Sequence, residues 1–195
     1  MVCDGVFVCF LPDDNNPNRT LPNRCKIFSK QQWGGYEAKS VTLLEHPTKY
    51  VVISHTAGHS CFESKTCSYF VRNIQNLHRS QPAYDDIGYN FLIGGDGNVY
   101  EGRGWDFASM HSGFVRNKNI AICFMGNFVK DSPTYIQVSS CEQLIDLGVK
   151  LGKLDTNYKV VAHNQTYNTL SPGTNIYSII STWPHFYVPS ADDPV

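Results

Sequence analysis

The sequence lacks long apolar runs. No stretch of its 195 residues reaches the about 20 consecutive apolar residues that a membrane-spanning helix needs. Residues 1–10 also have neither a basic start nor a long apolar segment, so they match a secretory signal poorly. We therefore expect no membrane-spanning helix.

Charge is also scarce. Charged residues make up 17% of the chain, and the formal net charge at pH 7 is −1. A nucleic-acid-binding protein needs a basic surface that attracts phosphates, and this charge balance provides none. Internal repeats and low-complexity tracts are missing too, and the length fits one domain. Nucleic acid is thus excluded as an expected partner.

Cysteine, in contrast, is abundant. Seven cysteines are unusual for a reducing compartment, so the sequence predicts an extracellular setting. Cys61 and Cys67 are near enough in sequence to close a small loop. Two matches to the N-glycosylation pattern, at 18–20 and 164–166, agree with that setting. The odd count leaves at least one thiol unpaired within the chain, with these candidates: Cys3, Cys9, Cys25, Cys123 and Cys141.

The composition divides the chain into three parts. Residues 1–24 are rich in proline, asparagine and aspartate and cannot present a periodic apolar face, which predicts a flexible arm or linker. The apolar content rises from Cys25 onward. We expect one folded domain over residues 25–187 and a short tail over 188–195.

Short runs rich in β-branched residues predict buried strands at residues 49–55, 120–125 and 159–163. A β-hairpin is predicted where the β-prone segments 89–93 and 99–101 flank a glycine-rich turn. Glycine supplies the positive φ that a tight reversal needs. Because a hairpin is antiparallel, the sheet that contains it should be mixed.

Three stretches have helical spacing. Phe70, Val71, Ile74 and Leu77 recur every three to four residues, as on the buried face of a helix. Residues 144–151, ended by Gly152, and 176–183, stopped by Pro184, predict two more helices. The fold class is therefore α/β, with a mixed central β-sheet, a β-hairpin and flanking helices.

Two histidines directly follow predicted strands. His55 and His163 should project from strand ends, where open sheets place their ligand crevices. Two imidazoles on one edge could bind a metal ion. For two histidines without a local spacing motif, however, a cap that bonds backbone groups is the favoured interpretation.

Several motifs carry a family resemblance. From about Trp33 to Phe186 the sequence resembles the peptidoglycan recognition proteins, which are related to bacteriophage-type zinc amidases. The resemblance implies that family's type 2 amidase-like fold. It is carried by Tyr89 in the hairpin and by three motifs: Ser54-His55-Thr56-Ala57, Ala162-His163-Asn164-Gln165 and Ser171-Pro172-Gly173.

One departure from the family pattern bears on activity. In amidases of this family, two histidines and a cysteine hold zinc, while a tyrosine and a residue two before the cysteine assist the attack of water. The matching positions here are His55, His163, Tyr89 and Thr169, but the cysteine position is Ser171. A neutral hydroxyl is a poor zinc ligand. The resemblance thus implies no metal, no cofactor and no amidase activity.

Other interpretations of Ser171 stay open. Ser171 followed by Pro172 matches a helix N-cap with proline at the first helical position, which is the favoured structural role. Ser171 could instead be a nucleophile, with His163 or His55 as its base, in a serine-type muropeptide peptidase. A zinc N-acetylmuramoyl-L-alanine amidase and a ligand-free decoy or regulator of immune signalling are the remaining alternatives.

The expected ligand is a muramyl peptide. Aromatic side chains near the hairpin, Tyr89, Trp105 and Phe107, suit a ligand with both sugar and peptide groups, although Trp105 and Phe107 could also be core residues. The resemblance adds His111 as a contact. The full set of predicted ligand-binding residues is His55, Tyr84, Tyr89, Arg103, Trp105, His111, His163, Thr169 and Ser171.

Arg103 should determine specificity. Diaminopimelate differs from lysine by one added carboxylate, which a guanidinium can bind bidentately. Receptors that prefer diaminopimelate-type peptidoglycan have arginine at the matching position, which favours that type here. The pair Ala83-Tyr84 matches neither dipeptide that the family uses for this choice. The alternative for Arg103 is a solvated surface charge.

The resemblance also implies a disulfide, a location and partners. Cys61 and Cys67 match a disulfide that is widespread in the family. Cys25 matches a cysteine that pairs with the second helix, but Leu147 stands at the partner position, which leaves Cys141 as an alternative. An innate immune protein of this kind is secreted or is a receptor ectodomain. It binds peptidoglycan and then associates with another immune signalling protein or with itself.

Overall fold

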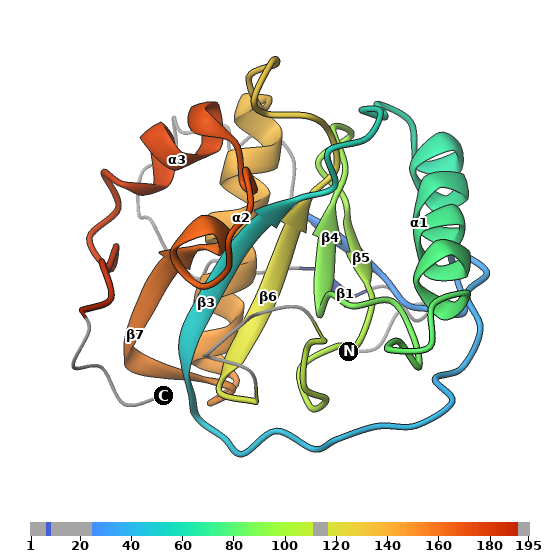
Figure 1. Cartoon of the computed structure of the whole chain (residues 1–195), viewed down its shortest axis with the longest axis horizontal. Coiled ribbons are helices and arrows are strands. Elements are labelled where there is room, and N and C mark those ends of the chain that lie inside the picture. The colour runs from blue at the N-terminus through green and yellow to red at the C-terminus, as the bar shows by residue number, and fades with distance from the viewer. Residues whose placement is uncertain (1–6, 9–24, 111–116, 191–195) are drawn as a thin grey trace.

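The computed structural model describes residues 7–8, 25–110 and 117–190. Within these residues, seven strands form one sheet in the order β1-β2-β5-β4-β6-β3-β7 (Figure 1). The strands are β1 (Phe7–Val8), β2 (Lys26–Phe28), β3 (Thr48–His55), β4 (Phe91–Ile93), β5 (Val99–Glu101), β6 (Asn119–Phe124) and β7 (Leu154–Ala162).

The sheet is mixed, as predicted. β3 pairs in parallel with β6 and β7, and β4 pairs in parallel with β6. β5 runs antiparallel to β4 and completes the predicted hairpin. The carboxyl ends of β3, β4, β6 and β7 therefore lie at one edge of the sheet.

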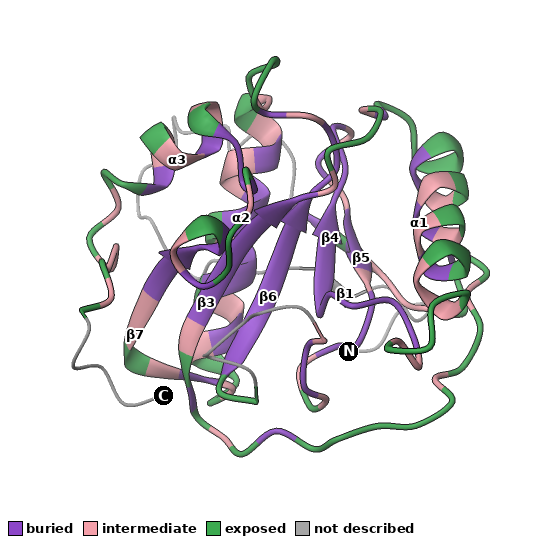
Figure 2. Ribbon diagram, in the orientation of Figure 1, coloured by how far each residue is buried: buried purple, intermediate pink, exposed green. Residues whose placement is uncertain are grey.

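β3 is the central strand of the parallel part. Residues 51–55 are all buried, because β6 and β7 flank the strand and the sheet is covered on both faces (Figure 2). The β-branched Val51, Val52 and Ile53 suit such a strand. Their pattern predicted this strand correctly.

Two helices cover one face of the sheet. The inner side of α2 (Tyr135–Lys150) and that of α3 (Thr174–Ile180) pack against alternate residues of the central strands in one hydrophobic cluster. Thr134 and Gln137 form a capping box at the start of α2, which satisfies backbone donors at that end. The other face receives α1 (Ser64–Arg79), which packs against the hairpin strands and stands to their right in Figure 1.

The buried face of α1 differs from the prediction in one residue. Leu77 is 60% exposed, whereas Cys67, Val71 and Gln75 are buried. Seven residues make about two helical turns, so His78, and not Leu77, lies on the same face as Val71. The prediction for Leu77 was wrong because several spacings of three to four residues fit the same apolar pattern.

The start of α3 corrects the predicted role of Ser171. The helix begins at Thr174, and its N-cap residue is Gly173, with a φ of 90°. A Cβ at this position would lie 2.4 Å from the backbone carbon of Phe128, so only glycine fits there. Ser171 is therefore not the N-cap, because the close approach of residue 128 places the cap two residues later.

The described cysteines answer most of the pairing question. Cys61 and Cys67 form the predicted disulfide, with their Cα atoms 5.2 Å apart. Cys123 and Cys141 are free and buried, so Cys141 is not the partner of Cys25. Cys25 is disulfide-bonded to a cysteine outside the described residues.

At the amino end, β1 pairs antiparallel with β2 at the edge of the sheet. The predicted boundaries at residues 24 and 187 remain predictions. None of the described helices has both the length and the apolar character that crossing a bilayer requires.

A buried ion pair fixes the chain just before the hairpin. Asp86 is 1% exposed, and its carboxylate accepts hydrogen bonds from Lys30 Nζ and, at 2.6 Å, from Gln75 Nε2. Gln75 lies on the buried face of α1, so the network ties this helix to the segments before β3 and β4. A buried carboxylate of this kind is strongly destabilising to remove, because its partners then lose their counter-charge.

We predict that Asp86→Ala lowers the free energy of unfolding by about 3 kcal/mol, because Lys30 is left largely buried without its counter-ion. Urea denaturation followed by circular dichroism measures this. The neighbouring Asp85 is the control: its carboxylate accepts an exposed hydrogen bond from Ser40, so Asp85→Ala should cost less than about 1 kcal/mol. Equal losses in the two variants would contradict the assignment.

Candidate ligand-binding groove

The two strand-end histidines lie at the same edge of the sheet. Ile53 of β3 pairs with Ala162 of β7, and His55 follows two residues after this pair while His163 follows one residue after it. His163 begins the short 3₁₀ helix η2 (His163–Gln165). Burial, and then the charge of His163, lower the pKa of His55 to about 4. The two imidazoles are thus near enough to interact, as their strand-end positions predicted.

His55 is held by two backbone contacts. Its Nδ1 accepts a hydrogen bond from the Phe128 N–H at 3.1 Å, so the neutral ring has its proton on Nε2. The His55 N–H donates to Ser171 Oγ at 3.0 Å, and Ser171 N–H donates to Thr169 Oγ1 at 3.2 Å. The structure therefore brings together three of the predicted site residues, His55, Thr169 and Ser171.

Next to this cluster lies the floor of a groove. Ser54 of β3 pairs with Cys123 of β6, and the Tyr89 hydroxyl reaches the Cys123 thiol on the face that α1 partly covers. Burial raises the pKa of Cys123 to about 12 and also raises the pKa of Tyr89. Both groups are therefore neutral at physiological pH and act as hydrogen-bonding groups and not as nucleophiles.

One wall of the groove is aromatic. The ring of His78, at the end of α1, stacks on Tyr84 with centroids 4.8 Å apart and lies 5.5 Å from the ring of Tyr89. The Gly88 N–H donates to His78 Nδ1 at 3.0 Å, which fixes the ring. Tyr84 and Tyr89 were predicted site residues, but His78 was missed. Its position two turns after Val71 was the signal that could have identified it.

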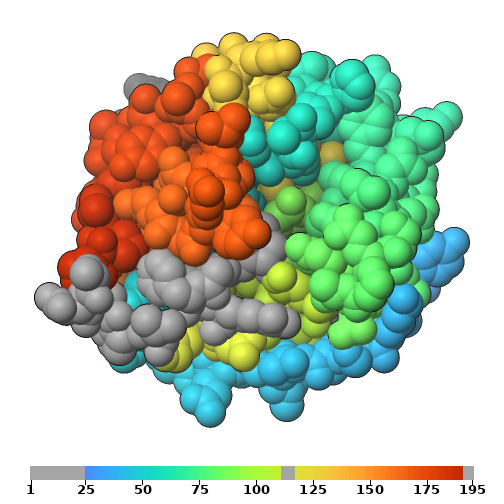
Figure 3. Space-filling view, viewed as in Figure 1, coloured from blue at the N-terminus to red at the C-terminus, as the bar shows by residue number. Residues whose placement is uncertain are grey.

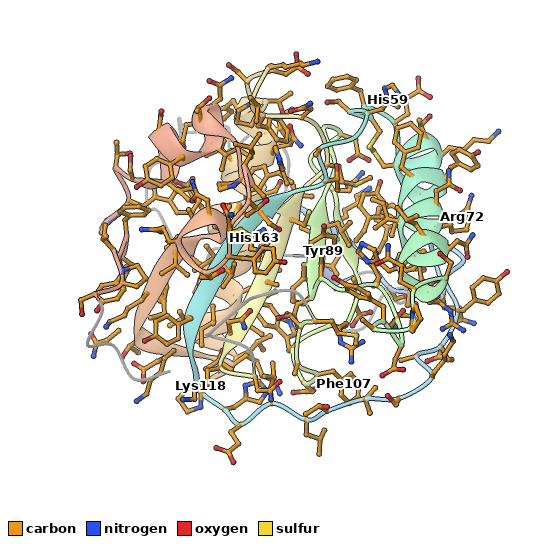
Figure 4. The ribbon with its side chains drawn as sticks, viewed as in Figure 1. His59, Arg72, Tyr89, Phe107, Lys118 and His163 are labelled. Carbon is orange, nitrogen blue, oxygen red and sulfur yellow. A yellow bond between two sulfur atoms is a disulfide. The ribbon has the colours of Figure 1, made fainter. Side chains whose placement is uncertain are left out.

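The opposite wall is the segment that follows β7. The rings of His163 and Tyr167 stack with centroids 6.1 Å apart, while Tyr167 and Leu170 remain 63% and 77% exposed. Figure 3 shows this face hollowed between that segment, in orange, and α1, in green. Figure 4 places Tyr89 and His163 in the middle of the same face. We call this hollow the central groove.

Trp105 does not line the central groove. Its ring lies 4.6 Å from that of Phe91, and a Cβ at Gly148 of α2 would touch it, which places it in the core on the opposite face of the sheet. The prediction that Trp105 binds ligand is thus corrected. Spacing could not reveal this, because the direction of the loop after β5 decides which face the indole reaches.

Arg103 is buried and is not the solvated charge of the alternative interpretation. It is 5% exposed, its Nε donates to the Ala108 carbonyl, and its Nη1 lies 3.3 Å from Met110 Sδ. These contacts hold the guanidinium in a fixed orientation. His111, also a predicted contact, lies outside the described residues.

Comparison with known proteins identifies the class. The family model for N-acetylmuramoyl-L-alanine amidase matches residues 44–174, which contain strands β3 to β7 and the residues of the central groove. Peptidoglycan recognition protein 1 of Mus musculus is 40% identical over 161 residues, 82% of this chain and 88% of its own length. Peptidoglycan-recognition protein SC2 of Drosophila melanogaster is 43% identical over 157 residues, 80% of this chain and 85% of its own.

Solved structures agree. The ectodomain complex of peptidoglycan recognition proteins LCa and LCx with tracheal cytotoxin matches with a TM-score of 0.81 and 43% identity, covering 84% of this chain and 99% of that chain. Peptidoglycan recognition protein LE, in complex with the same monomeric diaminopimelic acid-type peptidoglycan, matches with a TM-score of 0.81 and 37% identity, covering 83% and 96%. The chain belongs to the peptidoglycan recognition proteins, as its motifs indicated.

We predict that the groove makes stability depend on pH. Burial lowers the pKa of His78 from 6.5, and the charge of Asp86 opposes this shift only in part. Near and below pH 6.5 the unfolded chain therefore binds more protons than the folded chain. The free energy of unfolding should therefore fall as the pH drops from neutrality through about 6.5. Urea unfolding at several pH values measures this slope.

His78→Gln should flatten the dependence, because one source of proton uptake on unfolding is removed. The slope should not vanish, since the lowered pKa of His55 acts with the same sign. Identical slopes in the variant and the original chain would contradict this account of His78.

Proposed function

We propose that this protein binds peptidoglycan fragments in the central groove as an innate immune sensor and does not hydrolyse them. The observation that supports this most directly is the group at position 171. A hydroxyl stands there, and its oxygen accepts a hydrogen bond from the His55 N–H. Family members include both catalytic and non-catalytic proteins, and this residue favours the non-catalytic kind.

The side chains near His55 do not fit the zinc ion of the amidases. They provide two imidazoles and one hydroxyl, and one ring nitrogen of His55 already accepts the Phe128 N–H. Catalytic zinc sites use three protein ligands chosen from imidazole, thiolate and carboxylate. In the part of the chain that the structure describes, no group of three or more such residues could hold a metal ion.

The groove is suited to recognition. The aromatic wall of His78, Tyr84 and Tyr89 lies on one side of the hollow in Figure 3, and the segment that contains the exposed Tyr167 and Leu170 lies on the other. Ring faces and apolar groups can pack on the methyl and methylene groups of a stem peptide, while the Tyr89 hydroxyl and the imidazoles bond its amides.

Diaminopimelate is the favoured third residue of that stem peptide. The contacts with Ala108 and Met110 fix the plane of the Arg103 guanidinium. A guanidinium that is already held in place loses less conformational entropy on binding a carboxylate than a freely rotating one. The two solved relatives described above bind tracheal cytotoxin, of the diaminopimelic acid type. The predicted partner, a second immune protein or another copy, has its precedent in the LCa–LCx complex. The location that we propose is extracellular, secreted or as an ectodomain.

We predict that the purified protein binds zinc weakly and releases no peptide from muropeptides, whereas Ser171→Cys raises zinc affinity at least about tenfold, because it adds a thiolate beside both imidazoles. Plasma mass spectrometry of dialysed protein measures zinc, and mass spectrometry of digests measures peptide release.

Ser171→Ala is the matched control, since it removes the oxygen without adding a ligand. The double variant Ser171→Cys/His163→Ala should lose the gained affinity. One tightly bound zinc per original chain, with turnover abolished by His55→Ala, would contradict the proposal.

We predict that the protein binds a diaminopimelate-type muropeptide more tightly than the lysine type, and that Arg103→Ala removes about tenfold of this preference. Affinity for the lysine type should change little. Isothermal titration calorimetry with the paired ligands measures both constants.

Arg103→Lys is the conservative control. It keeps the positive charge but cannot bind a carboxylate bidentately, so it should retain only part of the preference. Because Arg103 is buried, thermal unfolding of each variant must show that the fold persists. If neither muropeptide gives a heat of binding, the decoy alternative is favoured and the proposed function is overturned.

A further inference from the structure

The turn after β7 contains an exposed asparagine in a modification motif. Asn164, Gln165 and Thr166 match the pattern Asn-X-Thr, in which X is any residue except proline and the asparagine accepts an N-linked oligosaccharide. The proposed function does not use this motif. The other match, at 18–20, lies outside the described residues, so Asn164 is the acceptor whose surroundings the structure shows.

The other residues of this turn hydrogen-bond to one another. The N–H groups of Thr166 and Tyr167 donate to the His163 carbonyl at 2.9 and 3.0 Å, and the Thr166 hydroxyl donates to the same oxygen at 2.9 Å. Gln165 Oε1 accepts the Ala162 N–H at 2.7 Å. The turn is thus held by its own backbone and by the side chains of Gln165 and Thr166.

Asn164 contributes no side-chain bond to this arrangement. Its side chain is exposed and has no hydrogen bond to any residue that the structure describes, whereas His163 and Thr166 are buried. An N-linked oligosaccharide is bulky and hydrophilic, so it must extend from the surface. Because modification of Asn164 Nδ2 breaks no hydrogen bond among the described residues, the folded chain can carry a glycan here at little cost in stability.

Asn164 also lies at the edge of the central groove. It directly follows His163, which Figure 4 places in the middle of the hollowed face. The exposed Tyr167 and Leu170 belong to the same segment, which forms one wall of the groove (Figure 3). Because Asn164 is exposed, a glycan that begins there occupies solvent beside this wall and leaves the buried floor of the groove unchanged.

We propose that Asn164 carries an N-linked glycan, which stands at the edge of the central groove and restricts the groove to soluble peptidoglycan fragments. The modification rests on the proposed extracellular location, and the restriction rests on the proposed function. In the modification, Asn164 Nδ2 forms a bond to the anomeric carbon of a lipid-linked oligosaccharide diphosphate. The bond from that carbon to the diphosphate oxygen breaks, the lipid diphosphate leaves, and Nδ2 loses one proton.

The restriction follows from the difference in size between the two kinds of ligand. A muropeptide monomer enters the groove from solvent and contacts only its walls. Insoluble peptidoglycan brings neighbouring chains close to the edge of the groove, where a flexible glycan would have to give up conformational freedom to make room. This entropic cost opposes binding of the polymer and not of the monomer.

Glycopeptide mass spectrometry tests the modification. The full chain is secreted from cultured human cells behind a cleavable signal peptide, and its digest is treated with peptide N-glycosidase F, which leaves aspartate where a glycan was attached. We expect this conversion at Asn164, and Asn164→Gln should remove the mass of one glycan. Asn168→Gln is the matched control, because Asn168 is exposed in the same segment but lies outside the pattern. An unmodified Asn164, with or without a glycan at Asn18, would overturn the proposal.

Two binding measurements test the restriction. Isothermal titration calorimetry with a diaminopimelate-type muropeptide should give affinities for the glycosylated chain and for Asn164→Gln that agree within about twofold. Sedimentation with insoluble peptidoglycan should recover at least about threefold more of Asn164→Gln than of the glycosylated chain. Enzymatic removal of the glycan from the original chain should give the same increase, whereas Asn168→Gln should give none.

Equal sedimentation of the glycosylated chain and Asn164→Gln would overturn the restriction, while a glycan found at Asn164 would still support the modification. If the glycan is present but neither form binds the muropeptide or the insoluble peptidoglycan, the proposed function fails and the modification site stands.

Discussion

Parallel pairing of β3 with β6 and β7 is the constraint on which the rest of the structure depends. It brings residues of three segments to one edge: His55 at the end of β3, Phe128 beyond β6 and His163 after β7. The contact from the Phe128 N–H to His55 links two of these segments, and the contact from the His55 N–H to Ser171 links a third. The central groove lies along this edge, because the sheet ends there.

The chemistry at this edge separates recognition from hydrolysis. An oxygen at position 171 accepts a backbone hydrogen bond, whereas a thiolate there would add a third metal ligand to the two imidazoles. In the proposed function, a groove that binds peptidoglycan is kept while the thiolate that would complete a metal site is missing.

Much of the fold was predictable from local pattern. β3 was identified because its β-branched run suits a strand buried on both faces, and the hairpin because glycines mark its turn. The buried face of α1 was predicted correctly except at Leu77, because Leu77 and His78 are adjacent and both lie six to seven residues after Val71. The sequence left two positions open for Trp105, the groove and the core, because the choice depends on the path of a loop toward α2.

The sequence alone determined the family, the strand-end positions of His55 and His163 and the absent thiol at position 171, because residue identity and local periodicity carry that information. Only the tertiary structure decided the partner of Ser171, the burial of Arg103 and the stacking of His78 on Tyr84. Each of these depends on segments that are distant in the chain and meet only when the sheet is assembled, so no local pattern encodes them.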